Sequence, residues 1–330
     1  MPEIEVRPFR RSDREQLTDL VNAHTQAVVP GMTLSVNTVL SQLERQPGEF
    51  IVDPWVSERL TLVAQQRGRV AAAAHLLRYF PDERAGDAYR GAGEIHWLLY
   101  WPEAPAQNPC WPDAAPAAGA LMTACLGQLA RWGVTSQHAG GELPAPGVYG
   151  VPEQWPHIVS LYEEAGFRHD GHTEGVYLAP VADLPADPEP PLPGLTVRRS
   201  VGMNGTRLAA VLGSEVAGYI EVEIVGAAER LPRQGGWADV GNLCVAERYR
   251  RRGVATWLLG QAAGWLRLAQ VDRLLDYAYT EGTDATGADY SDYRAFLAAS
   301  GFTLLTRTRR GWTRPPGDTP GGRAGHDAPG

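Results

Sequence analysis

The stretch that decides the fold runs from Asp239 to Leu259 and reads DVGNLCVAERYRRRGVATWLL. Its first part has the character of a strand that ends at Val245, and its last part is an amphipathic helix expected to start at Thr256. Between them, Gly253 lets the backbone approach a ligand closely, and the first N–H groups of a helix have no partner within it. Three adjacent arginines at 250–252 add positive charge to this turn. The pattern predicts a loop that captures an anion such as a pyrophosphate.

The spacing Arg250-x-x-Gly253-x-Ala255 resembles the acetyl-CoA-binding motif of the GCN5-related N-acetyltransferases, the GNAT family. The resemblance implies that the loop holds the pyrophosphate of acetyl-CoA and that backbone at the preceding strand end pairs with the pantetheine arm. The cofactor-binding residues that it implies are Leu243, Cys244, Val245, Arg250, Arg251, Arg252, Gly253, Val254, Ala255 and Thr256. We interpret the side chain of Cys244 as a small core residue.

A second signature occurs twice in the chain. The sequence from Leu161 to Phe167, LYEEAGF, resembles the Leu-Tyr-x-x-x-Gly-Phe that ends a late helix in this family, and the stretch from Phe296 to Phe302 keeps Gly-Phe but has Leu297 in place of the tyrosine. The chain therefore resembles two tandem GNAT domains, with a layout similar to that of the mycothiol synthases. This implies an α/β (α+β) fold in which each domain is a mixed, mostly antiparallel sheet flanked by helices. The second domain is expected to lack the early helices, because only 200–206 separates its first two strands.

The domain boundaries follow from composition. The chain of 330 residues suits two domains, and residues 179–194, APVADLPADPEPPLPG, are expected to form an extended linker. We expect a degenerate domain over 1–178, a domain with the intact motif over 195–314, and a disordered tail over 315–330. In the first domain Pro116 stands three residues before Gly119, where the motif has Arg or Gln, and a proline lacks an N–H donor. Coenzyme binding is therefore expected in the second domain.

The reaction implied by the resemblance needs a base for the attacking amine and an acid for the leaving thiolate. The family position of the base falls on Asp239, six residues before the end of its strand, and on Glu94 in the first half. A purely structural role for Asp239 stays open. Because Leu297 has no hydroxyl, we predict that Tyr293, one helical turn earlier, supplies the acid. Tyr290 is the alternative, and packing roles for both tyrosines stay open.

Composition excludes several classes of protein. All 30 basic residues are arginine, so neither a Schiff-base lysine nor the lysine of a phosphate-binding P-loop exists here. Residues 195–314 hold 16 arginines against 12 acids although the whole chain carries −8, which agrees with an anionic ligand in the second half. The three cysteines are widely spaced and predict neither a disulfide framework nor a metal site. We also expect a cytoplasmic protein, without a membrane-spanning segment and without a nucleic-acid partner.

The functional hypothesis is an acetyl-CoA-dependent N-acetyltransferase that acts on a small-molecule amine by direct attack on the thioester. The alternative is an acyl-CoA-binding regulatory module without turnover, which the missing tyrosine at Leu297 suggests. The absent early helices leave open whether the acceptor pocket is completed by the first domain or by a second copy of the chain in a homodimer.

Overall fold

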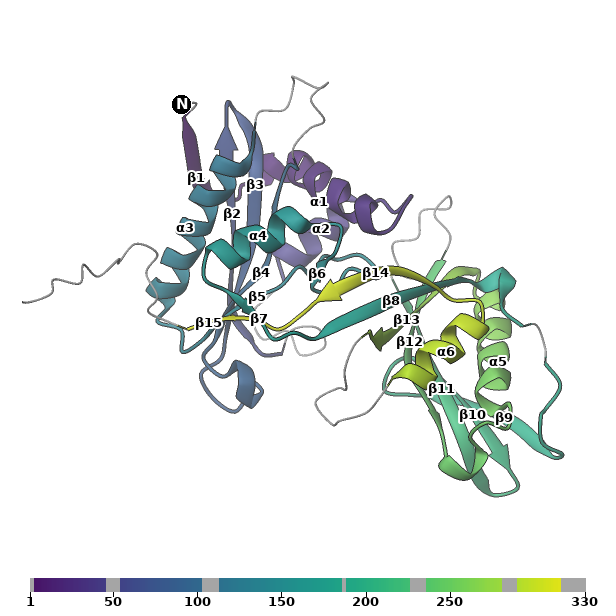
Figure 1. Cartoon of the computed structure of the whole chain (residues 1–330). Helices are drawn as coiled ribbons and strands as arrows, with labels where there is room; N and C mark the ends of the chain where they lie inside the picture. Colours follow the sequence, from purple (N-terminus) through teal and green to yellow (C-terminus); the bar gives the residue numbers. More distant parts are fainter. Residues whose placement is uncertain are drawn as a thin grey trace, which may run out of the picture. The chain divides into compact units, whose positions relative to one another are not determined.

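The computed structural model describes residues 3–45, 54–102, 113–185, 188–225, 236–280 and 290–315. The chain forms two compact units, Met1–His172 with Arg309–Gly330, and Thr173–Thr308 (Figure 1). It leaves the first unit after His172, builds the second, and returns at Arg309. The predicted α/β class with two mixed, mostly antiparallel sheets is confirmed.

Among its described residues, the first unit has a seven-stranded sheet and four α-helices. Its strands in spatial order are β1 (Ile4–Pro8), β2 (Val56–Gln66), β3 (Arg69–Tyr79), β4 (Gly93–Tyr100), β5 (Gln137–Ala139), β15 (Trp312–Arg314) and β7 (Arg168–His169). The helices are α1 (Arg14–Val28), α2 (Val36–Leu43), α3 (Ala115–Trp132) and α4 (Pro156–Glu164), and the short strand β6 (Val151–Pro152) precedes α4. The β4–β5 pair is parallel, whereas β1–β2, β2–β3 and β3–β4 are antiparallel.

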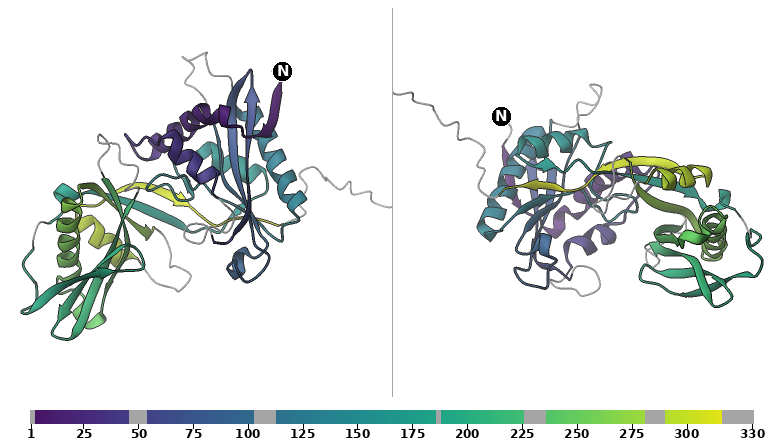
Figure 2. Two further views of the ribbon diagram at one scale, coloured as in Figure 1. Left: turned by 180° about the vertical axis from the view of Figure 1, so that it is seen from behind. Right: turned by 60° about the horizontal axis from the view of Figure 1, so that its bottom comes forward.

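Strand β3 is the centre of the first unit's core. Residues 70–77 are buried at every position, which is the pattern of a strand covered on both faces. Helices α1 and α3 both contact β3, and the small side chains of Ala71–Ala74 allow close approach (Figure 2).

Within its described residues, the second unit is built on a second sheet and two α-helices. Its strands in spatial order are β14 (Thr303–Arg309), β8 (Thr173–Pro180), β13 (Val271–Tyr279), β12 (Gly236–Val245), β11 (Glu215–Val225), β10 (Thr206–Leu212) and β9 (Leu195–Val201). Helix α5 (Val254–Leu268) packs on β10–β13, and α6 (Ser291–Ala299) follows later in the chain. Only residues 202–205 separate β9 from β10, so the prediction that the early helices are absent is confirmed.

Two strands lie in the unit opposite to the one that sequence proximity suggests. Strand β8, assigned to the first domain up to residue 178, pairs antiparallel with β13 from Pro180↔Arg273 to Glu174↔Tyr279. Strand β15, near the end of the predicted second domain, pairs with β5 and β7 of the first unit. Backbone hydrogen bonds in a sheet form between the strands whose edges are adjacent in space, whether or not these strands are close in the sequence.

The Pro-rich stretch after β8 packs against α5. Leu184 and Leu192 are buried in the core of the second unit, and the Arg267 guanidinium donates hydrogen bonds to the carbonyl oxygens of Val181 at 2.8 Å and Leu184 at 2.6 Å. Within the described residues, no helix is long and apolar enough to cross a membrane. The predicted disordered tail lies, from residue 316 onward, outside the described residues.

Candidate active site

The site in the second unit begins where two parallel strands separate. Strands β12 and β13 pair in parallel from Gly236 to Asp239, and the pairing ends at Asp239↔Leu275. Strand β12 continues to Val245 along its other neighbour, β11, so a gap opens between its last residues and β13. A cavity of about 350 Å³ fills this gap, and Val240–Leu243 of β12 form one of its walls. Backbone groups at such a gap are free to pair with an extended ligand.

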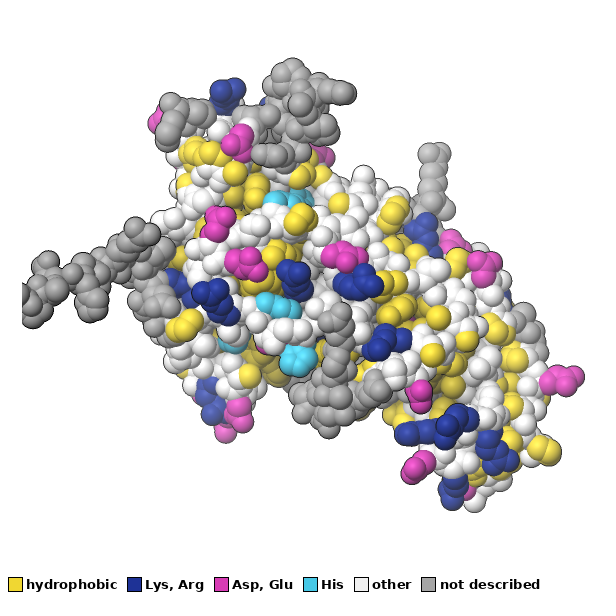
Figure 3. Space-filling view, viewed as in Figure 1, with side chains coloured by type: hydrophobic (Ala, Val, Ile, Leu, Met, Phe, Trp, Pro, Cys, Tyr) yellow, Lys and Arg dark blue, Asp and Glu magenta, His cyan; other side chains and the backbone are white. Residues whose placement is uncertain are grey.

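The predicted anion loop lies directly after this strand. The chain passes through a short 3-10 helix, Glu247–Tyr249, and a turn in which Arg251 has φ +57° and Gly253 has φ +81° before α5 starts at Val254. No side chain caps this helix, and the first N–H groups of a helix have no partner within it. Arg side chains gather at this end of the second unit (Figure 3), and the three arginines of the turn are exposed. The turn combines a helix N-terminus with cationic side chains, as anion binding requires.

The strand end that leads into the loop is partly open to solvent. Leu243 and Val245 are half-buried, and the Arg250 guanidinium donates a 3.1 Å hydrogen bond to the carbonyl oxygen of Val245. Cys244 is exposed, so its interpretation as a core residue is wrong. Side chains alternate between the faces of a strand, and at this position the chain places Cys244 on the uncovered face.

Tyr293 lies on α6 and contacts a carboxylate that the sequence analysis did not select. Its hydroxyl donates a 2.7 Å hydrogen bond to Oδ2 of Asp276, a buried residue of β13, and both side chains line the cavity. Burial raises the pKa of Asp276 to about 7, because the hydrogen bonds from Tyr293 and from the Tyr277 N–H only partly offset desolvation. Burial and the neighbouring Asp276 raise the pKa of Tyr293 as well. The Asp276 carboxyl group can therefore take up or release a proton near neutral pH.

Asp239 is half-buried and lies at the last position of β12 that pairs with β13. Its Oδ1 accepts a 3.0 Å hydrogen bond from the Tyr277 hydroxyl. Asp239 is not among the described residues that line the cavity, whereas Asp276 and Tyr277 are. Its role as a base stays a prediction. The signal that could have found Asp276 is the sequence LLDYAY at 274–279, where an acid interrupts an apolar strand directly after Leu275, the last residue of β13 that pairs with β12.

The two positions of the repeated late-helix signature are both buried. The Tyr162 hydroxyl donates a 2.8 Å hydrogen bond to the carbonyl oxygen of Gly140 in the first unit, and Leu297 lies fully buried in the core of the second. Gly119 lies within the first two turns of α3, and Pro116 stands at the start of that helix. The segment 103–112, which contains most of the loop before α3, lies outside the described residues.

Comparisons with known proteins were made at the level of sequence and of fold. A family model described as the acetyltransferase (GNAT) family matches residues 159–288, a range that contains the strand, loop and helix described above. No curated protein matches the sequence.

Three solved structures have the same fold at low identity. A tandem GNAT protein from the clavulanic acid biosynthesis pathway has a TM-score of 0.62 at 17% identity, over 96% of this chain and 100% of that one. A GCN5-related N-acetyltransferase from Sphaerobacter thermophilus has a TM-score of 0.57 at 15% identity, over 94% and 95%. A glucosamine N-acetyltransferase region of a fungal multi-domain β-N-acetylglucosaminidase has a TM-score of 0.59 at 13% identity, over 95% and 38%. The similarity in layout to mycothiol synthases stays a prediction.

Proposed function

We propose that this chain is an acetyltransferase of the GNAT family, whose model matches residues 159–288, and that its second unit transfers the acetyl group of acetyl-CoA to a small amine. The observation that carries the proposal is the gap between β12 and β13, which opens beside the loop predicted to bind an anion and contains a carboxyl group with a pKa of about 7. In this proposal the extended thioester lies along Leu243–Val245 of β12, and its pyrophosphate lies on the turn at 250–256 before α5.

In the proposed reaction the neutral amine attacks the thioester carbon directly. A C–N bond forms, the C–S bond breaks, the amine nitrogen loses one proton, and the thiolate gains one. The ionised form of Asp276 accepts the proton from nitrogen, since a base is most effective when its pKa lies near the working pH. The Tyr293 hydroxyl donates a 2.7 Å hydrogen bond to Asp276, and in this proposal it returns the proton toward sulfur. Asp239 is the alternative base, linked to the cavity through Tyr277.

The proposed coenzyme site is tested by adding a negative charge to the first turn of α5. Gly253 is a poor position for this purpose. Its φ of +81° would strain the backbone of any residue that replaced the glycine, and a Cβ atom there would lie 3.1 Å from Pro191. Thr256 is exposed in the same turn, and an acid at a helix N-terminus does not destabilise the helix. Thr256→Glu should weaken binding of coenzyme A at least about tenfold through charge repulsion, while the size-matched Thr256→Gln should weaken it far less.

Isothermal titration calorimetry with coenzyme A measures this difference, and circular dichroism checks the fold of each variant. Equal affinities of the Glu and Gln variants would overturn the assignment of the loop. Turnover is tested separately by incubating the wild-type chain with acetyl-CoA and a panel of primary amines. Free thiol and an acetylated amine of the expected mass support the transferase. Tight coenzyme binding without thiol release from any amine would instead support the binding module that the buried Leu297 suggests.

A further inference from the structure

A proline-rich segment lies along helix α5, the helix that begins at the loop predicted to bind an anion. This segment, residues 188–194, is the proline strap; it belongs to the second unit and leads into β9 (Figure 1). Its downstream end is anchored by the buried side chain of Leu192, whose carbonyl oxygen accepts a 3.1 Å hydrogen bond from the N–H of Leu195. The acetyl transfer proposed above gives the proline strap no role.

Two glycines of α5 allow the proline strap to approach the helix closely. A Cβ atom on Gly260 would lie 2.5 Å from Cγ of Pro188, and a Cβ atom on Gly253 would lie 3.1 Å from Cβ of Pro191. The two spacings agree, because seven helical residues rise about 10 Å and three residues of extended proline-rich chain span about 9 Å. The strap and the helix therefore run in opposite directions and stay in contact over two helical turns.

The contact at Gly253 brings the proline strap to the predicted anion loop. Gly253 has φ +81° and Arg251 has φ +57°, so two residues of this turn lie in the left-handed region. A residue other than glycine keeps that conformation only where the surrounding structure holds it. The carbonyl oxygen of Gly253 accepts a 3.0 Å hydrogen bond from the N–H of Trp257, which ties the turn to the helix. Pro191, with its rigid ring, packs against this turn from outside the helix.

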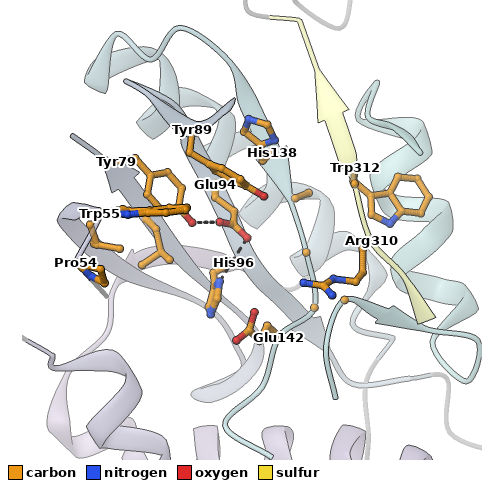
Figure 4. A pocket seen from close by; sticks show the side chains of 17 residues that line it. Pro54, Trp55, Tyr79, Tyr89, Glu94, His96, His138, Glu142, Arg310 and Trp312 are labelled. Atoms are coloured by element: carbon orange, nitrogen blue, oxygen red, sulfur yellow. Dashed lines mark hydrogen bonds and ion pairs between the residues drawn. The ribbon is translucent and has the colours of Figure 1, made fainter. Parts of the chain in front are cut away.

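The first unit has a comparable gap between parallel strands, but its helix has no comparable strap. Glu94 lies in a cavity of about 420 Å³ where β4 and β5 diverge (Figure 4). In α3, the helix after β4, an added Cβ atom at Gly119 would meet no described atom within 4 Å. One at Gly127 would meet only the Arg131 guanidinium of the same helix, at 3.8 Å. Among the described residues, the close contact of a proline strap with helix glycines therefore occurs in the unit that has the Arg-rich turn at 250–253.

We propose that the proline strap is a positioning element for coenzyme binding. Pro191, packed against Gly253, holds the turn at 250–253 in the conformation that binds the pyrophosphate. This inference rests on the coenzyme site proposed above. A loop that already has its binding conformation loses less conformational freedom when the ligand binds, so the affinity rises with the fraction of molecules in which the turn is formed. A change at Gly260, two helical turns from the loop, should therefore alter the affinity for coenzyme A.

The first test displaces the proline strap at its contact far from the loop. Gly260→Ala places a methyl group in the space that the ring of Pro188 occupies, and this rigid ring has to move. Isothermal titration calorimetry of the full chain with coenzyme A should give an affinity about fivefold or more below that of the wild type. Gly127→Ala, the same replacement in the interior of α3, is the matched control and should bind coenzyme A like the wild type.

Hydrogen exchange of the chain without coenzyme separates the effect of the strap from the effect on the helix. Alanine favours a helix more than glycine does, so an effect on the helix alone should slow exchange of the Trp257 N–H, which bonds to Gly253. Loss of the strap should instead make this amide exchange about threefold or more faster than in the wild type. Faster exchange of the Leu195 N–H shows in the same experiment that the strap has moved.

A second variant covers the case in which Gly260→Ala fails to fold. Pro191 is exposed, so Pro191→Gly leaves the core closed; it should weaken coenzyme A binding about threefold or more and speed exchange at Trp257. The proposal is overturned by wild-type coenzyme affinity in both variants, by unchanged or slower exchange at Trp257 in both, or by an equal loss of affinity in Gly127→Ala. These results leave the proposed function standing, whereas a wild-type chain that binds no coenzyme A would overturn the proposed function as well.

Discussion

Replacing Asp276 by asparagine is predicted to change how the stability of the second unit depends on pH. Burial raises the pKa of Asp276 to about 7, against an ordinary value of about 3.9. The folded unit therefore binds this proton roughly a thousandfold more tightly than the unfolded chain does. Above about pH 4 the unfolded chain has released the proton while the folded unit keeps it, so a rise in pH favours the unfolded chain until the folded carboxyl also ionises near pH 7.

The magnitude follows from the difference between the two pKa values. A thousandfold difference in proton affinity corresponds to about 4 kcal/mol in the free energy of unfolding, of which about 3 kcal/mol is lost between pH 5 and pH 8. The asparagine side chain has nearly the same volume as the aspartic acid and no proton to release. The free energy of unfolding of Asp276→Asn, relative to the wild type, should therefore rise by about 3 kcal/mol over that interval.

The assay must report on the second unit alone, because a chain of two units need not unfold in one step. Urea unfolding followed by hydrogen exchange of peptides from α5 and β13 meets this requirement. Asp272→Asn is the matched control, since Asp272 lies on the same strand and is exposed. A stability difference between wild type and Asp276→Asn that is the same at both pH values would refute the reasoning. It would show that the carboxyl is ionised in the folded unit throughout.

Three further variants test the packing and hydrogen bonds described above. Tyr293→Phe removes the hydrogen bond that favours the ionised form of Asp276, so the pKa of Asp276 should rise and the acidic limb of the pH–rate profile should move to higher pH. An acidic limb at the wild-type pH would show that this hydrogen bond does not tune the catalytic base. Tyr162→Phe leaves the Gly140 carbonyl without its donor and should cost the first unit about 1–3 kcal/mol in urea unfolding, and a change in coenzyme affinity would contradict this structural role. Leu297→Ala should cost the second unit about 2–5 kcal/mol in the same assay, and a cost below about 1 kcal/mol would mean that the helix repacks.

The local sequence around residues 239–259 predicted the fold and the loop that we propose binds the cofactor. The short spacing at 200–206 predicted the absence of early helices in the second unit. These features are readable because they depend on near neighbours in the chain. A glycine that tolerates a positive φ, a run of arginines and the start of an apolar helix act within a few residues of one another. The observed α5 starts at Val254, two residues before the expected start, which is within the usual uncertainty of a helix end.

What only the tertiary structure decided is which distant residues share a site. Asp276 and Tyr293 belong to a strand and a later helix, and their 2.7 Å contact exists only because α6 lies beside the gap between β12 and β13. The cavity around Glu94 is likewise completed by Arg310, from the far end of the chain, because β15 joins the edge of β5. The pairing of strand edges and the burial that raises the pKa of Asp276 both depend on contacts between residues that are distant in the sequence. A local sequence pattern therefore cannot predict them.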